Sequence, residues 1–410
     1  MPRATASSVQ LEVGMDGSTR PMGRLEPICD HTACFDAALR ERADASRTVI
    51  MAVTNAGFAS FWHNLRCSLE RVGVARHALI VGTDDEACTA ALAPGVACLV
   101  GERLFWPEAA AAELQGGAVS HGTAPYARLM HVKARPTLEA IRRGYNVLTT
   151  DTDIVFFRDP LAHLRGMLAD ADGGSDGDEG PHVLIQSDHD EVNEGACSEH
   201  HECPRSHWCE AGRCADEVCG GFHWMRGGAA EPQALLEGMF GLFEQQRSKG
   251  TRPAPHRPAP RAGQRGCGCG VAACVACAVA HTHGHARPSF SLHSCSPSAR
   301  VAGDHRTGEQ PALNYAIRRV AGLRFRTLPR ALYPNGAAYF DRGIRPADGQ
   351  LPYIVHNNWI SGLSAKRARF ERHAMWLALG GAGGGEGAGV EPARPGACVA
   401  TALHASAASV

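Results

Sequence analysis

Two aspartates separated by one residue interrupt an otherwise apolar run in the segment VLTTDTDIVFFRDP. Asp151 and Asp153 stand at or near the carboxyl end of a predicted strand, the edge where open α/β sheets bind ligands. Strand side chains alternate between two faces, so we expect the two acids to point the same way. Such a pair can bind a hard divalent cation that also holds diphosphate oxygens, although paired acids are often merely solvated. Buried carboxylates need a partner, which favours the metal site.

The elements that must position these acids alternate between strands and helices. Apolar runs predict buried strands in TVIMAVTN, HALIVG and NVLTTDTDIVFF. Apolar residues at helical spacing predict helices in FASFWHNLRCSLERVG and in TAPYARLMHVKARPTLEAIRRG, which Pro136 interrupts. The acids Asp84-Asp85-Glu86 are expected at the start of a helix, where they suit the helix dipole. The pattern predicts an α/β fold, with a mostly parallel sheet covered by helices on both faces.

Charge and hydropathy exclude several classes of protein. The 41 Lys and Arg residues balance 42 Asp and Glu residues, so bulk charge gives no argument for nucleic acid or an anionic membrane. No apolar run is long enough for a transmembrane helix, and the opening residues lack the apolar core of a signal peptide. We therefore expect membrane association only through an anchor that is not present in this chain.

Cysteine is unusually frequent, with 16 residues in the chain. Five lie between Cys197 and Cys219, and five more between Cys267 and Cys295. Dense cysteines suggest an oxidising compartment or a metal site. The spacings in the first cluster fit no C-x2-C zinc pattern well, so we favour disulfides, with zinc or free thiols as the alternatives.

Composition divides the chain into three parts: an irregular N-terminal segment over 1–46, a catalytic domain over 47–378 and a flexible Gly-rich tail over 379–410. Two insertions interrupt the middle part, a Cys-rich one at 195–219 and a second at 250–305. The second is rich in Pro, Ala, Gly, Cys and His and has no sustained amphipathic period, so it is expected to be disordered. A translated non-coding segment is the origin we favour for it, and metal binding by CGCGVAACVAC and HTHGH is a further alternative.

LTTDTDIVFFRDP resembles the metal-binding strand of the nucleotide-diphospho-sugar transferase family, which includes plant and algal cell-wall xylosyl- and arabinosyltransferases. Further segments resemble that family in the same order: VTNAGFASFWHNLRCSLERVGV, YARLMHVKARPTLEAIRRGYNVL, HVLIQSD, CGGFHWMRGG, EQPALNYAI, LYPNGAAYF and VHNNWISGLSAKRARF. Glu309 departs from the family, which usually has Asp before Gln310. The resemblance implies a GT-A (Rossmann-like) fold and a location in the Golgi.

The resemblance also implies a metal-ligand set. His356 matches the histidine that completes metal coordination, so Asp151, Asp153 and His356 are expected to bind Mn²⁺, or Mg²⁺ in its place. A strand-end histidine packed against Trp359 is the structural alternative. Lys366 matches a basic residue that grips diphosphate, and Gly362 can allow close backbone approach to phosphate. A solvated helix face would explain Lys366 equally well.

Other residues are predicted to line the substrate pockets. Thr54 and Asn55 end the first strand, where the family places its nucleotide pocket, although a turn would also explain them. Arg128 and Lys133 can reach the diphosphate or the sugar, or lie on a surface helix face. Asp188 and, by strand alternation, Gln186 are catalytic candidates at the sugar or acceptor pocket. The remaining candidates for that pocket are Gly220, Gly221, Gln310 and Asn314.

These residues predict a metal-dependent glycosyltransferase. It would transfer a sugar from a nucleoside diphosphate sugar, expected to be a UDP-sugar, to a hydroxyl of a glycan or glycoprotein. The resemblance implies retention of the anomeric configuration. Two other functions remain open: a catalytically inactive family member that binds carbohydrate or acts as a scaffold, and a metal-dependent phosphohydrolase. No nucleic-acid partner is expected.

Overall fold

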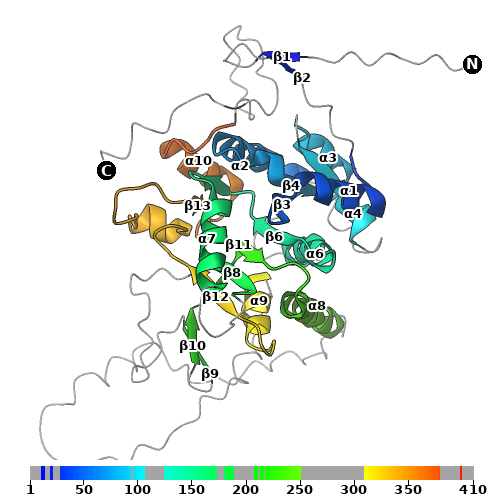
Figure 1. Ribbon diagram of the computed structural model, residues 1–410, viewed down its shortest axis with the longest axis vertical. Coiled ribbons are helices and arrows are strands. Elements are labelled where there is room, and N and C mark those ends of the chain that lie inside the picture. The colour runs from blue at the N-terminus through cyan, green and yellow to red at the C-terminus, as the bar shows by residue number, and fades with distance from the viewer. Residues whose placement is uncertain are drawn as a thin grey trace, which may run out of the picture. The chain divides into compact units, whose positions relative to one another are not determined.

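The computed structural model describes residues 11–13, 19–21, 28–93, 96–106, 124–172, 180–188, 207–210, 213–216, 218–250, 309–378 and 398 (Figure 1). The chain forms two compact units, one of residues up to Phe243 and from Arg306 on, and a second over Glu244–His305. The first unit contains the sheet and the site. Of the second, only the end of one helix is described, and most of the predicted insertion at 250–305 lies outside the described residues.

Helices and strands alternate through the first half of the chain, as the sequence predicts. The described helices are α1 (Thr32–Arg42), α2 (Ala59–Arg71), α3 (Asp85–Ala91), α4 (Gly101–Leu104), α6 (Ala124–Arg142), α7 (Pro160–Asp172), α8 (Ala230–Gly250), α9 (Glu309–Ile317) and α10 (Leu363–Arg372), with short helical turns η1 (Ala56–Phe58), η2 (Ala75–His77) and η5 (Ala337–Asp341). The described strands are β1 (Leu11–Val13), β2 (Thr19–Pro21), β3 (Thr48–Thr54), β4 (Ala78–Gly82), β5 (Ala97–Val100), β6 (Asn146–Thr150), β7 (Ile154–Phe156), β8 (Val183–Ser187), β9 (His207–Glu210), β10 (Arg213–Asp216), β11 (Val218–Met225), β12 (Phe325–Leu328) and β13 (Ile354–His356).

Seven of the described strands form one sheet in the order β12-β8-β11-β6-β3-β4-β5. Only β11 is antiparallel to both of its neighbours, β6 and β8, so the other six strands run in one direction. The chain moves from β3 outward through β4 and β5, and then returns to place β6 on the other side of β3. The strand order therefore reverses between β3 and β6, which is where doubly wound sheets bind ligands.

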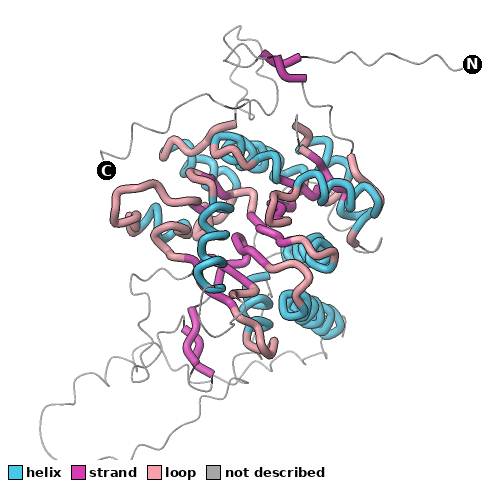
Figure 2. The backbone as a smooth tube through the Cα atoms, viewed as in Figure 1, coloured by secondary structure: helices cyan, strands magenta, loops and turns pink. Residues whose placement is uncertain are grey.

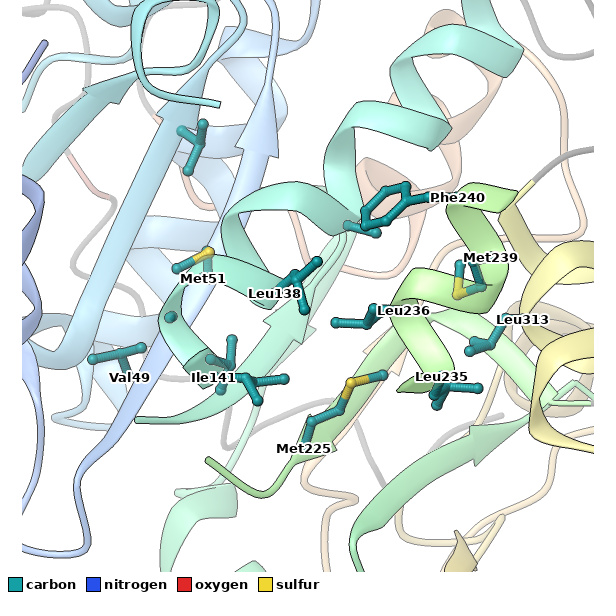
Figure 3. Close-up of a cluster of buried hydrophobic side chains, with 14 of the residues drawn as sticks. Val49, Met51, Leu138, Ile141, Met225, Leu235, Leu236, Met239, Phe240 and Leu313 are labelled. Carbon is teal, nitrogen blue, oxygen red and sulfur yellow. The ribbon is translucent and has the colours of Figure 1, made fainter. Parts of the chain in front are cut away.

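The sheet is covered on both faces, because alternate residues of its buried strands belong to different cores. In β3, Val49 and Met51 pack with α1, α6, α8 and α9, whereas Ile50 and Ala52 pack with α2, α3 and α7. Figure 2 shows helices around the strands of the main sheet, and Figure 3 shows the first of these cores between the sheet, α6 and α8. The predicted α/β class, with a mostly parallel sheet covered on both faces, is confirmed.

One predicted strand is in fact two. The run NVLTTDTDIVFF divides into β6, in the main sheet, and β7, which pairs with β13 in a separate two-stranded sheet. Asp151 and Asp153 lie in the link between them, so strand alternation does not set their directions. The prediction of a single strand was wrong. Two short buried strands joined by a brief link show the same apolar pattern in sequence as one long buried strand. The position at the carboxyl end of β6 is confirmed.

Three disulfides are found among the described cysteines: Cys29–Cys34, Cys67–Cys398 and Cys88–Cys98. The second joins α2 to a residue near the C-terminus, 331 positions away in the chain. The predicted disulfide cluster at 197–219 does not include Cys219, which has a free and buried thiol. The side chains of the other cysteines in both predicted clusters lie outside the described residues.

Two further findings concern helices. Asp84 caps α3 by accepting from the backbone N–H of Ala87 at 2.7 Å, which confirms the predicted helix start. None of the helices within the described ranges is both long and apolar enough to cross a membrane.

Candidate active site

Three potential metal ligands meet at the carboxyl edge of the main sheet. Asp151 Oδ2, Asp153 Oδ1 and His356 Nε2 share one centre: the imidazole nitrogen lies 3.5 Å from the first oxygen and 3.4 Å from the second. Their ligand atoms all lie within 4.8 Å of one another. The structure therefore brings together, across about half of the chain, the three side chains that the sequence predicts as metal ligands.

Strand pairing explains why His356 reaches the two acids. β13 pairs antiparallel with β7, and this register sets His356 opposite Ile154, the residue that follows Asp153. The backbone N–H of Asn357 then donates to the carbonyl of Asp153 at 2.9 Å. Behind this small sheet, Val155 and Val355 are fully buried against Phe61 and other apolar side chains. The apolar packing of two short strands therefore fixes the position of the polar centre.

Each acid divides its two oxygens between this centre and a lysine. Lys133, which is buried, lies 2.5 Å from Asp151 Oδ1, and Lys366 pairs with Asp153 Oδ2. The remaining oxygens face His356. Unpaired buried charge is costly, so the two lysines stabilise the ionised form of the two aspartates. One oxygen of each aspartate is left for a cation.

The lysines and the histidine keep both acids ionised. Burial and the Asp153 charge would raise the pKa of Asp151, but the Lys133 ammonium and the contact with His356 together outweigh them, and the pKa lies well below its ordinary value. The same balance lowers the pKa of Asp153, with Lys366 and then His356 as the opposing charges. Burial would lower the pKa of His356, but its contacts with Cys219, Asp153 and Asp151 raise it well above its ordinary value.

The chemistry of these donors fits a hard divalent cation. Carboxylate oxygens and one imidazole are ligands that Mn²⁺ accepts, and Mg²⁺ prefers the oxygens. Ligand atoms 3.4 and 3.5 Å apart are close to the spacing of about 3 Å between neighbouring ligands of an octahedral ion. His356 would supply its Nε2 lone pair to such an ion, and Asp151 and Asp153 one oxygen each.

Gln186 fixes the orientation of His356. Its amide nitrogen donates to the Tyr333 carbonyl at 3.0 Å, which leaves its oxygen 2.9 Å from His356 Nδ1. This oxygen can only accept, so Nδ1 carries a hydrogen and Nε2 faces the acids. Gln186 is fully buried, under the histidine, and this differs from its predicted place at the sugar pocket. Strand alternation could not identify this partner.

Gly221 provides the space that the centre occupies. A Cβ built on this glycine would lie 2.2 Å from His356 Cε1 and 2.6 Å from Asp151 Oδ2. The neighbouring Gly220 uses its carbonyl to accept from Lys133 at 3.3 Å. Gly221 therefore lies directly against the ligand set and Gly220 against Lys133, both on β11, the strand of the main sheet that is antiparallel to its neighbours.

Asp188 is the hub of a second polar group at the same edge. Its Oδ2 accepts from the Gln310 amide at 2.6 Å, and its Oδ1 from the Asn358 amide at 3.3 Å and the Trp359 indole N–H at 3.2 Å. These donors come from α9 and from the loop that follows β13. Asp188 and Gln310, both predicted from sequence, are thus in direct contact.

The other predicted residues occupy various positions. Thr54 and Asn55 are buried at the end of β3, where Asn55 caps η1 by accepting from the Phe58 N–H at 3.2 Å. Asn314 is buried and hydrogen-bonds both the N–H and the carbonyl of Val218. Gly362 precedes α10 with a φ of +89°, a left-handed conformation that favours glycine. Arg128 lies in a part of α6 whose side chains are outside those described.

Sequence reasoning missed three side chains at this edge. Cys219 Sγ lies 3.5 Å from His356 Nδ1, and burial raises the pKa of its thiol. Asn358 and Trp359 contact Asp188, and the motif HNNW, already singled out for its histidine, was the signal that could have found them. Cys219 opens the segment CGGFHWMRGG, which was singled out for its glycines, but it was counted with the Cys-rich insertion.

Residues 73–236 match the family model described as nucleotide-diphospho-sugar transferase. Over these residues the chain is similar to that family. The matched region contains Lys133, Asp151, Asp153, Gln186, Asp188 and Gly221, whereas His356, Lys366 and Gln310 lie beyond it.

Curated relatives of the chain are themselves named as glycosyltransferases. A β-arabinofuranosyltransferase of Arabidopsis thaliana is 24% identical over 82% of the chain and 48% of its own length. A UDP-galactose:fucoside α-3-galactosyltransferase of Dictyostelium discoideum is 22% identical over 63% of the chain and 29% of its own length. The chain thus spans less than half the length of either relative. Among solved structures, mouse xyloside xylosyltransferase 1 is 12% identical, with a TM-score of 0.37 over 77% of this chain and 99% of that one.

Proposed function

We propose that this chain is a metal-dependent glycosyltransferase of the GT-A type, which transfers a sugar from a nucleoside diphosphate sugar to a hydroxyl of a glycan. The observation that carries the proposal is the shared centre of Asp151, Asp153 and His356 at the edge of the sheet, next to the reversal in strand order. A UDP-sugar is the expected donor, because two relatives are named for UDP-galactose and UDP-D-xylose. Both names also specify a fucose acceptor.

The chain's own residues suggest how transfer proceeds. When bound, Mn²⁺ or Mg²⁺ would neutralise charge on the departing diphosphate. Lys366, whose side chain is 21% exposed, can exchange its contact with Asp153 for a phosphate oxygen, while the buried Lys133 keeps Asp151 in place. Asp188 already accepts three hydrogen bonds. We infer that it orients Gln310 and stabilises positive charge at the anomeric carbon, rather than forming a covalent bond.

The disulfides indicate where such an enzyme would work. Three cysteine pairs among the described residues are oxidised, and such pairs persist in secretory compartments. This supports a location in the Golgi lumen, where donor and glycan acceptor would meet. Retention of the anomeric configuration, which the family resemblance implies, is the stereochemistry we propose.

Release of nucleoside diphosphate tests the function directly. The protein would be incubated with a panel of UDP- and GDP-sugars, with Mn²⁺ or with a chelator, in the presence and absence of simple methyl glycosides. We expect release from one UDP-sugar that requires the metal and rises with an acceptor. Folded protein that binds donors and releases nothing with any acceptor would instead support an inactive, carbohydrate-binding member of the family.

Replacing Gln186 tests the support of the metal ligand. Gln186→Met keeps the volume but removes the oxygen that accepts from His356 Nδ1, so the imidazole loses its fixed orientation. We expect Mn²⁺ affinity, measured by electron paramagnetic resonance titration, to fall about 10- to 100-fold. Gln233→Met in α8, where Gln233 contacts only the nearby Ala229 carbonyl among the hydrogen bonds described, is the matched control. Equal affinity in both variants would contradict the role given to Gln186.

A further inference from the structure

Trp359 presents an aromatic ring to solvent beside the candidate active site. The residue is 55% exposed, and among the large apolar residues that the structure describes only Ile28 is also exposed. Its indole N–H donates to Asp188 Oδ1 at 3.2 Å, so the polar edge of the ring is directed inward. The ring is held at its nitrogen, and its apolar surface stays available to a ligand.

The backbone at Trp359 is held in an unfavourable conformation. Its φ is +59°, in the left-handed region that residues other than glycine rarely adopt. Such conformations persist only where the surroundings impose them, and they concentrate at ligand sites. The loop therefore holds Trp359 in an unfavourable backbone conformation. Burial of the ring does not explain this conformation, because the residue is exposed.

The two preceding residues supply the constraint. Asn357 accepts from Arg369 Nε at 2.6 Å and donates to the Lys366 carbonyl at 2.8 Å. Asn358 accepts from the Gly336 N–H at 2.6 Å through its side chain, and its carbonyl accepts from Arg369. The loop is thus tied to α10 and to the turn before η5, and the indole is preorganised.

The strand order indicates on which side of the candidate active site Trp359 lies. Asn55 follows β3, Asp151 follows β6 and Asp188 follows β8, with the reversed β11 between the last two. Adjacent strands lie about 4.8 Å apart, so Asp188 is about 10 Å from β6 and about 14 Å from β3 along this edge. Trp359 is held at the β8 side, away from the reversal in strand order where a nucleotide is expected.

We propose that Trp359 is a stacking platform for a pyranose ring of the acceptor glycan. The C–H face of the sugar would lie on the indole, as planar rings stack on aromatic side chains in other recognition sites. One oxygen of Asp188 accepts from the indole nitrogen of Trp359, and the other accepts from the Gln310 amide. The carboxylate therefore links acceptor binding to the reacting edge of the sheet. This inference rests on the proposed glycosyltransferase function and names the subsite that its acceptor uses.

Binding of methyl glycosides tests the platform. Methyl α-L-fucopyranoside, methyl β-D-xylopyranoside and methyl β-D-galactopyranoside would be titrated into the full chain loaded with Mn²⁺ and UDP, with saturation-transfer difference NMR as the readout. We expect Trp359→Ala to weaken the best-bound glycoside about tenfold, and Trp359→Phe, which keeps a ring, to retain most of the affinity. Ser361→Ala, an exposed change two residues along the same loop, is the control and should bind like the original chain.

The possible outcomes separate this inference from the function on which it rests. Unchanged glycoside binding in Trp359→Ala would overturn the platform, as would failure of every glycoside to bind the original chain. Loss of UDP binding in place of glycoside binding would assign the ring to the donor base and overturn it too. If the chain releases UDP from a donor but its glycoside binding does not depend on Trp359, the transferase function is kept and only the platform is refuted. Trp359-dependent binding without any donor release would refute the function and keep a sugar subsite.

Discussion

Replacing Asp151 and Asp153 with asparagine is expected to lower metal-dependent release of nucleoside diphosphate by at least about 100-fold. Each carboxylate gives one oxygen to the centre at His356, and asparagine offers a neutral and weaker ligand in the same volume. Loss of the supporting groups around metal ligands already costs about 10- to 100-fold, so loss of the ligands themselves should cost more. Mn²⁺ titration and donor-release assays on the single and double variants would measure it.

The control for these variants must remove an acid without touching the site. Asp85→Asn serves, because Asp85 is half-exposed in the first turn of α3 and pairs with Arg103. The asparagine variants also remove the carboxylates that pair with Lys133 and Lys366, so thermal unfolding should accompany every assay. Folded variants that keep full metal-dependent release would show that these acids are structural partners of the lysines and nothing more.

Gly221→Ala is expected to have the second largest effect. The added methyl group would lie 2.2 Å from His356 Cε1 and 2.6 Å from Asp151 Oδ2, far inside contact distance, so the histidine and the acid must separate. Overpacking of this kind costs about 1–3 kcal/mol in free energy of unfolding. The ligand set would lose its geometry, so we expect Mn²⁺ binding to be lost even where the fold survives.

Gly166→Ala provides the comparison for that change. Gly166 lies in α7 with no atom within 4 Å of the Cβ position, and alanine favours helix, so stability should hold or rise slightly. Chemical denaturation measures stability, and Mn²⁺ titration measures the site. Tight Mn²⁺ binding by Gly221→Ala would mean that His356 and Asp151 can adopt another arrangement, and the described centre would then not be the metal site.

The fold was largely predictable from sequence because its strands are buried on both faces. Runs such as TVIMAVT and ALIVG are typical of buried strands and fit few other structures. The acids from Asp84 to Glu86 likewise mark the start of α3, which Asp84 caps. The division of NVLTTDTDIVFF between two sheets was not predictable. Pairing of β7 with β13 depends on residues about 200 positions later, and no local pattern encodes a partner that distant.

The candidate site divides along the same line. Asp151, Asp153 and His356 were identified by type and motif, and the structure brings them together as expected. The contacts of Gln186 and Asp188 could not be predicted. The same local sequence would allow a glutamine at a strand end to face either a sugar or a histidine. Gly221 could be flagged as a close approach, but only the structure shows that the approaching groups are His356 and Asp151 rather than a substrate.

The bond between Cys67 and Cys398 has a practical consequence for anyone who handles this protein. It closes a covalent ring around almost the whole chain, so a protease cut at any peptide bond between the two cysteines releases no fragment. A nicked molecule would run as intact material on a denaturing gel without reductant, and would separate into two pieces only after reduction. Electrophoresis with and without reductant, side by side, is therefore the measure of an uncut preparation, and a lone non-reducing lane would conceal the cut.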